Sequence, residues 1–447
     1  MIMKKIILSV LAIAIVAATA GAKTPKKVKE QPLLWPDGTV VPEWFLSAEV
    51  PSPESLGKIY NLRDLGVESN PNLVQTAAIQ AVIDRAAAEG GGVIVIPEGI
   101  YKSGALFFRQ GTHLHLKRGA VLLGSESILD FPVTMTRIEG EVCRYFPALI
   151  NIDHLDGFTL TGNGTIEGNG FPYWRAFGMR ASWKRDWTNK DEQRPRLVHV
   201  SHSTNVVLAD AALQNSPFWT CHIYKSDHVK IIGLRLYSPR SSASADGIDL
   251  DACTNVLVKG CRITVNDDAV CFKGGKGPWA DQDANNGANE NILVEDVYFD
   301  HTTGSCVTCG SECIQTHNII VRNCTVEQGQ NLLQLKMRPD TPQHYEFIRL
   351  ENIKGSCAAV LHCAPWTQFF DLKGREDIPR SYGEHIVFKD LELECRSFAN
   401  VRRVDDQFTL NDITFDHVKV ATPRPDWQRD AIDNLTVIET YVNDVKQ

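Results

Sequence analysis

The chain has 447 residues with 46 Lys+Arg and 54 Asp+Glu, so its formal net charge is -8. Its 43% hydrophobic and 22% charged residues are typical of a globular protein and exclude wholesale disorder, collagen and coiled coil. The acidic balance argues against nucleic acid as the partner, because phosphate binding requires a basic surface.

The N-terminus has the pattern of a secretory signal peptide. Lys4 and Lys5 precede an apolar run, and the small residues of Ala20-Gly21-Ala22 suit signal peptidase. No second stretch of about twenty apolar residues follows, so we expect no membrane span. The sequence predicts a signal peptide over residues 1–22, an N-terminal extension over 23–56, and an exported (periplasmic or secreted) protein.

One amphipathic helix is predicted early in the chain, over residues 75–89. Its apolar residues recur at helical spacing, and Gly90-Gly91-Gly92 ends it. We expect it to cap the first turn of a solenoid, because the open end of a repeat array must be covered. Further along, residues 179–196 hold six basic and three acidic residues with Trp183 and Trp187. This segment is either a solvated loop or an arm that lays tryptophan and positive charge beside an anionic sugar.

A short phrase, a polar residue followed by alternating aliphatic residues, recurs through the rest of the chain. Its first aliphatic residues stand at 206, 229, 256, 292, 319, 348 and 386, which gives steps of 23, 27, 36, 27, 29 and 38. A period of about 25 with loop insertions is typical of a parallel β-helix with three short strands per coil. The alternation by two excludes an α-solenoid. Residues 57–447 are therefore predicted to form an all-β, right-handed parallel β-helix, a single solenoid with the helix as its cap.

Carboxylates concentrate in two neighbouring stretches. Asp246 and Asp267 are 21 residues apart, close to one coil, and Asp268 is next to the second. On adjacent coils they would lie about 4.8 Å apart. Crowded carboxyls of this kind serve glycoside hydrolysis, where one remains protonated as the acid and another activates water. Asp-Gly and Asn-Asp are also ordinary turn residues, and that interpretation stays open.

These stretches carry a family resemblance. Ser244-Ala245-Asp246-Gly247-Ile248-Asp249 and Asn266-Asp267-Asp268 resemble the Asn-Thr-Asp and Gly-Asp-Asp signatures of family 28 glycoside hydrolases, the polygalacturonases and rhamnogalacturonan hydrolases of pectin breakdown. The resemblance extends from about residue 57 to 420. It implies inverting hydrolysis of α-linked galacturonic acid, with Asp267 as general acid and with Asp246 and Asp268 holding the attacking water.

Two family motifs are altered in this sequence. Ser305 stands where the family has a histidine, with His301 four residues earlier, and Gln334 replaces the arginine of Arg-x-Lys, whose lysine is Lys336. Gln334, Lys336 and Arg338 share one face of a strand by alternation. We therefore expect Arg338 to supply the planar fork that grips the substrate carboxylate beside Lys336.

The remaining motifs point to no metal or cofactor. The cysteines at 306, 309 and 313 have no partner motif at ligand spacing, and we expect buried thiols, with a disulfide left open. The stretch from Asp281 lacks the bidentate Glu that ends a calcium loop. Loops around Trp183, Trp279 and Trp366 would close one end of the cleft, which favours exo attack on a pectic oligo- or polysaccharide.

The alternatives are a rhamnogalacturonan hydrolase and a non-catalytic, carbohydrate-binding β-helix. A calcium-dependent pectate lyase on the same fold is disfavoured, because no carboxylate cluster has calcium-ligand spacing.

Overall fold

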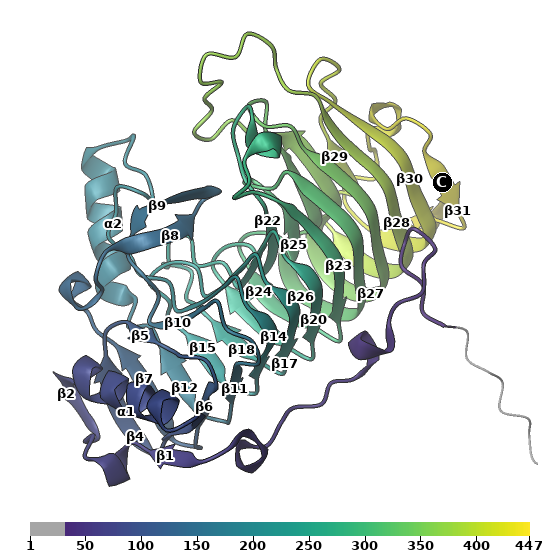
Figure 1. Cartoon of the computed structure of the whole chain (residues 1–447). Helices are drawn as coiled ribbons and strands as arrows, with labels where there is room; N and C mark the ends of the chain where they lie inside the picture. The colour runs from purple at the N-terminus through teal and green to yellow at the C-terminus, as the bar shows by residue number, and fades with distance from the viewer. Residues whose placement is uncertain (1–31) are drawn as a thin grey trace, which may run out of the picture. The chain divides into compact units, whose positions relative to one another are not determined.

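The computed structural model describes residues 32–447, and Leu34–Gln447 form one compact unit (Figure 1). The predicted signal peptide, residues 1–22, lies outside the described residues. No helix of the described part is long and apolar enough to cross a membrane.

Short parallel strands stack coil upon coil in three rows, as predicted for a right-handed parallel β-helix (Figure 1). The row that we call the site row consists of β5 (Leu106–Phe107), β10 (Ile150–Asp153), β13 (Val198–Ser201), β16 (Cys221–Tyr224), β19 (Ile248–Asp251), β22 (Val270–Lys273), β25 (Val307–Cys309) and β29 (Ala399–Val401). The second row consists of β1 (Ile59–Asn61), β3 (Gly92–Ile96), β6 (Thr112–Leu116), β11 (Thr159–Thr161), β14 (Thr204–Ala209), β17 (Asp227–Ile232), β20 (Thr254–Lys259), β23 (Ala288–Glu295) and β31 (Thr436–Ile438). The third consists of β2 (Asn70–Val74), β4 (Gly99–Ser103), β7 (Ala120–Gly124), β12 (Thr165–Glu167), β15 (Ala212–Gln214), β18 (Arg235–Tyr237), β21 (Arg262–Val265), β24 (Tyr298–Thr302) and β32 (Tyr441–Val442).

The later coils bend without a break between rows. Four long strands therefore run through more than one row: β26 (Gln315–Met337), β27 (His344–Pro365), β28 (Ser381–Cys395) and β30 (Phe408–Ala421). Two antiparallel pairings depart from the solenoid. One joins β32 to β33 (Val445–Lys446), and the other makes a hairpin of β8 (Thr134–Ile138) and β9 (Glu141–Tyr145).

The recurring phrase marks one corner of each coil. Its leading polar or aromatic residue has a φ of 51° to 56° at all seven positions. This left-handed conformation suits Asn, because its short polar side chain bonds locally. Each first aliphatic residue then pairs in register with that of the next coil, from Val206↔Val229 to Ile348↔Ile386. All of them are buried in one continuous core, so the predicted stacking is confirmed.

The predicted N-terminal helix is confirmed as α1 (Thr76–Ala88), which buries Ile79, Val82, Ile83 and Ala86 against the first coils. A second helix, α2 (Phe171–Trp183), was not predicted from the sequence. Its weak periodicity buries only Tyr173 and Trp174. The 3-10 helices are η1 (Glu43–Leu46), η2 (Pro53–Leu56), η3 (Arg63–Leu65), η4 (Ile128–Asp130), η5 (Ala280–Gln282) and η6 (Arg429–Ala431).

The segment 179–196, predicted to be either a solvated loop or an arm beside an anionic sugar, is solvated only in part. Trp183 is 85% exposed, but Glu192, Arg194 and Arg196 are almost completely buried. The arginines are buried because they bond the hairpin and the loop before β16: Arg196 donates to the carbonyl of Arg137.

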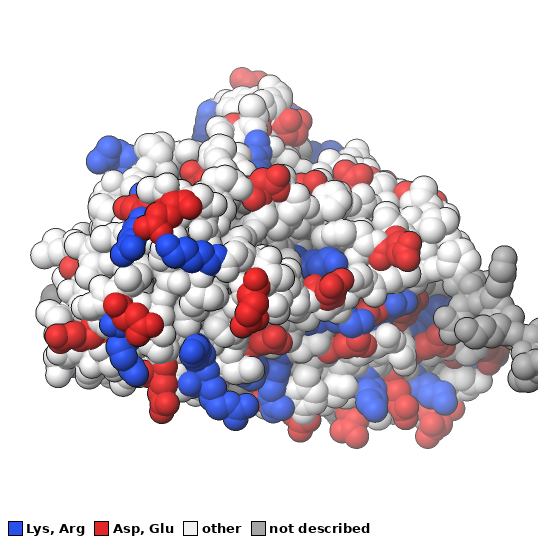
Figure 2. All heavy atoms as spheres, turned by 60° about the horizontal axis from the view of Figure 1, so that its bottom comes forward, with Lys and Arg blue, Asp and Glu red and all other residues white. Residues whose placement is uncertain are grey.

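Stacked coils place charged side chains side by side on the surface and most thiols in the interior. On the face in Figure 2, basic and acidic side chains are interspersed, as expected when neighbouring coils form ion pairs such as Arg262–Asp300. The twelve cysteines are free thiols, and eleven of them are buried, as predicted for most. Cys357 and Cys395 come closest to a disulfide, with their Sγ atoms 3.4 Å apart.

Candidate active site

Two turns place the acidic side chains just before two neighbouring strands of the site row. Asp246 stands two residues before β19, and Asp267 and Asp268 stand three and two residues before β22. The register pairs Ile248 with Val270, an offset of 22, so Asp246 is level with Asp268. We predicted an offset of 21 that stacks Asp246 on Asp267. The predicted register is wrong by one residue, because the coil spans 22 residues, whereas Asp246 and Asp267 are 21 residues apart.

Asp268 is held as a carboxylate. Nζ of Lys336 lies 2.7 Å from its Oδ2, and the backbone N–H of Ser305 donates to its Oδ1 at 2.9 Å. Burial raises the pKa of Asp268, but the Lys336 charge and these hydrogen bonds outweigh it, and the net pKa is lowered.

Asp267 is in the opposite state. Burial, followed by the like charges of Asp246 and Asp268, raises its pKa to about 8. Burial and the neighbouring Asp249 also raise the pKa of Asp246 well above its ordinary value. The two adjacent carboxyls, 267 and 268, therefore differ in protonation at neutral pH, as an acid and its partner must.

Three charged residues that the sequence analysis did not select complete the cluster. Lys273, at the end of β22, places Nζ 3.3 Å from Asp246, 3.5 Å from Asp249 and 3.5 Å from Glu312. Strand alternation could have revealed Asp249 and Lys273, since both project from the face opposite the core residues Leu250 and Phe272. No local pattern marks Glu312, which follows β25 in an irregular turn.

Ser305 and Gln334, which replace the family histidine and arginine, form a hydrogen-bonded pair next to the aspartate cluster. Ser305 is fully buried, and its hydroxyl donates to Oε1 of Gln334 at 2.8 Å. Asn331 donates in turn to the Ser305 hydroxyl at 3.0 Å. Lys336 lies 4.6 Å from the centre of the Trp366 ring, so this predicted aromatic residue contacts the cluster.

The prediction that Arg338 offers a free fork is wrong. Its Nε and Nη2 bond both carboxylate oxygens of Asp340 at 2.8 and 2.7 Å, and the side chain is 1% exposed. The carbonyls of Gln368 and Phe369 accept its other hydrogen bonds. Strand alternation placed Arg338 beside Lys336, but β26 ends at Met337 and the following turn supplies its own carboxylate.

We expect Arg338→Ala to destabilise the fold. The change leaves Asp340 buried without its counter-charge, which costs about 3–5 kcal/mol. Replacing both partners, as in Arg338→Met with Asp340→Leu, should recover much of that loss. Urea unfolding of the three proteins measures the effect. An unfolding midpoint unchanged in Arg338→Ala would contradict it.

His301 lies apart from the cluster. Arg240 donates through Nε to His301 Nε2 at 3.0 Å, and the imidazole lines a shallow hollow of about 130 Å³ with Gln328 and Arg396. His301, which the sequence left as an open candidate for substrate binding, therefore shares this hollow with none of the three aspartates.

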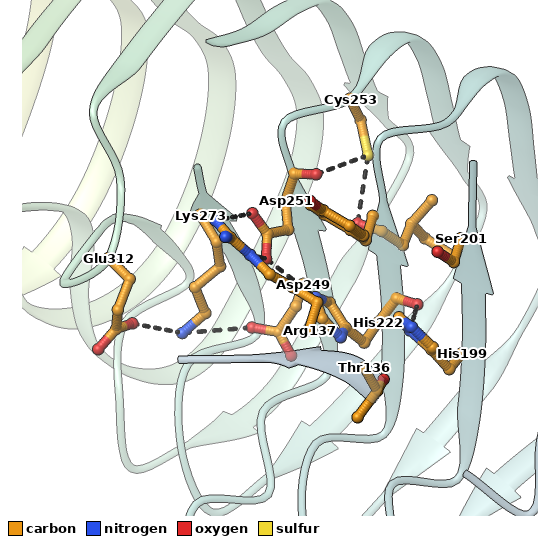
Figure 3. Close-up of polar contacts among 12 residues, drawn as sticks. Thr136, Arg137, His199, Ser201, His222, Asp249, Asp251, Cys253, Lys273 and Glu312 are labelled. Carbon is orange, nitrogen blue, oxygen red and sulfur yellow. Dashed lines mark hydrogen bonds and ion pairs between the residues drawn. The ribbon is translucent and has the colours of Figure 1, made fainter. Parts of the chain in front are cut away.

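The β8–β9 hairpin crosses the site row and is anchored by a buried ion pair. Arg137 bonds both oxygens of Asp251 at 3.0 and 3.2 Å, and His222 bonds the same carboxylate at 3.2 Å (Figure 3). Arg196 donates to Nδ1 of His222 at 2.7 Å, so the His222 proton is on Nε2 and is donated to Asp251. At the hairpin tip, Gly140 packs so closely that an added Cβ would lie 3.0 Å from Glu312.

Three clusters of the described residues contain side chains of the types that metals bind, without being metal sites on that ground alone. Ligand atoms of Asp246, Asp249 and Cys271 lie within 4.8 Å of one another, but the Lys273 ammonium already supplies these carboxylates with a positive charge. Two further groups lie nearer the surface: Asp153, His154 and His202, and His344, Glu346 and Glu384.

A right-handed parallel β-helix with a buried cluster of carboxylates and lysines on one strand row has the fold and the acid–base groups of a glycoside hydrolase. Residues 123–358, more than half of the chain, match the sequence profile of the glycosyl hydrolases family 28. The chain belongs to this family.

The individual proteins compared with this chain are 18–30% identical to it. A probable polygalacturonase of Vitis vinifera is 30% identical over 224 residues, which are 48% of this chain and 44% of that protein. An exo-poly-alpha-D-galacturonosidase of Dickeya chrysanthemi is 23% identical over 334 residues, 63% of this chain and 52% of that protein. The chain thus spans about half the length of these relatives. The crystal structure of a hyperthermoactive exopolygalacturonase from Thermotoga maritima has the same fold, with a TM-score of 0.74, 18% identity, and coverage of 89% of this chain and 94% of that one.

Proposed function

We propose that this protein is an inverting glycoside hydrolase that releases α-linked galacturonic acid from the ends of pectic chains. The observation that carries the proposal is the unequal environment of two adjacent buried carboxyls: Nζ of Lys336 lies 2.7 Å from Asp268, whereas burial and like charges act on Asp267. Asp267, with its pKa raised to about 8, holds a proton at neutral pH, while Lys336 keeps Asp268 ionised. Family membership makes glycosidic oxygen the expected target of that proton.

In the proposed mechanism Asp267 protonates the leaving glycosidic oxygen. Asp246 and Asp268 hold a water molecule, and Asp246, once it is ionised, accepts a proton from this water as the water attacks the anomeric carbon. Lys336 fixes the orientation of Asp268, and together with Trp366 it offers one cation and one aromatic face to a uronate ring. The Ser305 and Gln334 pair supports these groups without a charge of its own.

Exo action is supported by the hairpin. Close to its tip the hairpin is tied to β19 through Arg137 and Asp251, and Gly140 in the turn lies against Glu312 beside the cluster. A polymer running along the site row would meet this hairpin, whereas a chain end would not. The similarity to the Dickeya exo-poly-alpha-D-galacturonosidase favours the same preference.

Rhamnogalacturonan hydrolysis is the second candidate. It is favoured because Gln334 stands where the family has an arginine, and because the guanidinium of Arg338 is engaged by Asp340.

Digestion of defined oligomers tests both candidates. With galacturonan oligomers we expect galacturonic acid monomer as the first product, released with inverted anomeric configuration, as seen by proton NMR in the first minutes. Rhamnogalacturonan oligomers form the parallel arm. Retention of configuration would refute the mechanism, and a ladder of larger first products would refute exo action. Turnover of rhamnogalacturonan alone would favour the second candidate. Binding without turnover of either would indicate a carbohydrate-binding protein.

A further inference from the structure

The Lys273 ammonium lies at a junction of three carboxylates. Its Nζ is 3.3 Å from Asp246, 3.5 Å from Asp249 and 3.5 Å from Glu312, and Figure 3 shows the side chain reaching between Glu312 and Asp249. The side chains of all four residues are less than a tenth exposed, so water screens these charges weakly.

Other groups limit where the ammonium can move. The Trp219 ring lies 4.5 Å from Nζ on one side, and the Cys271 thiol is on the same strand face. Beyond Asp246 lie Asp268 and Lys336, which act on Asp246 with opposite sign. One buried positive charge therefore serves three carboxylates at once.

The positive charge of Lys273 acts strongly on Glu312. Burial raises its pKa, but Lys273, then Lys276 and the Ser311 hydroxyl, outweigh burial, and the net pKa is lowered. For Asp249, by contrast, burial raises the pKa to about 7. Neither of its carboxyl oxygens has a hydrogen-bond partner in the described structure. The hairpin tip packs against Glu312, since a Cβ added at Gly140 would lie 3.0 Å from the Cβ of Glu312.

We propose that Lys273 and Glu312 are positioning residues: their ion pair divides one positive charge between Glu312 and Asp246, and so sets the pH at which Asp246 becomes the carboxylate that activates water. Neither residue needs to touch the substrate. This inference rests on the proposed function, in which Asp246 must be ionised.

Two substitutions should move the pH profile in opposite directions. Lys273→Met removes the positive charge, so Asp246 should ionise only at higher pH, and the acidic limb of kcat/KM should move up by about one pH unit. Glu312→Gln removes the competing carboxylate and releases the ammonium to Asp246, so the same limb should move down. Damage to packing alone lowers kcat without opposite shifts of a limb.

Two controls complete the experiment. Lys273→Arg keeps the charge and should keep the limb near its wild-type position. Lys259→Met removes a lysine that pairs with Glu295 and Asp296 away from the cluster, and should leave the whole profile unchanged. Limbs that do not move, or that move in the same direction in Lys273→Met and Glu312→Gln, would overturn the inference.

The wild-type profile separates this inference from the proposed function. Wild-type protein without turnover on galacturonan or rhamnogalacturonan oligomers refutes the proposed function. In that case, carbon NMR titration of carboxyl-labelled aspartate in wild type, Lys273→Met and Glu312→Gln still decides the inference. Opposite shifts of the Asp246 titration support it, and unchanged titration rejects it.

Discussion

Asp267→Asn is expected to lower kcat on galacturonan oligomers by about 10²–10⁴-fold while the protein stays folded. Asparagine keeps the shape and an acceptor for the N–H of Asp268, which bonds Oδ1 of Asp267 at 3.1 Å, but has no acidic proton to give the leaving oxygen. In the wild type we expect activity to fall as pH rises through about 8, because Asp267 then loses its proton. Steady-state kinetics from pH 4 to 9 measure both effects.

The stability of this variant provides a second readout. With a folded pKa of about 8, Asp267 holds a proton in the folded state that an unfolded aspartate releases at about pH 4. The folded state thus binds more protons between these values, and this group makes stability fall as pH rises from about 4 to about 8. Asp267→Asn should remove that contribution and be at least as stable as wild type at pH 7.

The matched control is Asp300→Asn, which removes an aspartate from the partly exposed pair with Arg262 on a different row. Its kcat should equal that of the wild type. Full activity in Asp267→Asn would refute the assignment of the general acid, whereas equal loss in both variants would point to a nonspecific effect on folding.

The fold was predictable because its information is local and repeated. Each coil places a residue that tolerates positive φ before an alternating aliphatic run, so seven separate stretches give the same answer. Even Phe347 and His385 take the left-handed conformation, because the stacked coils on both sides impose it. The three aspartates were predictable for the same reason: they lie at the ends of short strands whose order along the chain is also their order in space.

The surroundings of the aspartates were not predictable. Glu312 contacts Lys273 through an irregular turn, and Arg137 contacts Asp251 across 114 residues of sequence. Arg338 was predicted to lie on the strand, but β26 ends one residue before it and Asp340 engages it, and alternation cannot reveal how a turn beyond the strand folds back. Insertions carry these contacts, and an insertion has no counterpart in the next coil from which to infer its position.

Arg137→Met is expected to release the hairpin from the site row. The change leaves Asp251 buried beside His222, whose pKa is lowered to about 4 by burial, so the imidazole is neutral at pH 7 and does not replace the lost charge. An uncompensated buried carboxylate costs about 3–5 kcal/mol. Lifting the hairpin hydrates Asp251, so we expect the cost to appear as local opening rather than as global unfolding.

Hydrogen exchange of the segment 134–145 measures this opening. A loss of about 3–5 kcal/mol corresponds to exchange faster by roughly 10²–10⁴-fold, while the core strands of the second row keep their protection. Adding Asp251→Leu to Arg137→Met removes the stranded charge and should restore part of the protection. The control Arg262→Met breaks a pair whose arginine side chain is 56% exposed, and should change stability by less than about 1 kcal/mol.

The same variant tests why the hairpin matters for the proposed reaction. If the hairpin restricts the site to chain ends, its release should allow attack within the chain, and oligomers longer than one sugar should appear among the first products. Faster exchange with unchanged monomer release would mean that the hairpin is loosened but does not select chain ends. Unchanged exchange would refute the role of the Arg137–Asp251 pair as its anchor, because no other ion pair in the described structure joins β8 to the site row.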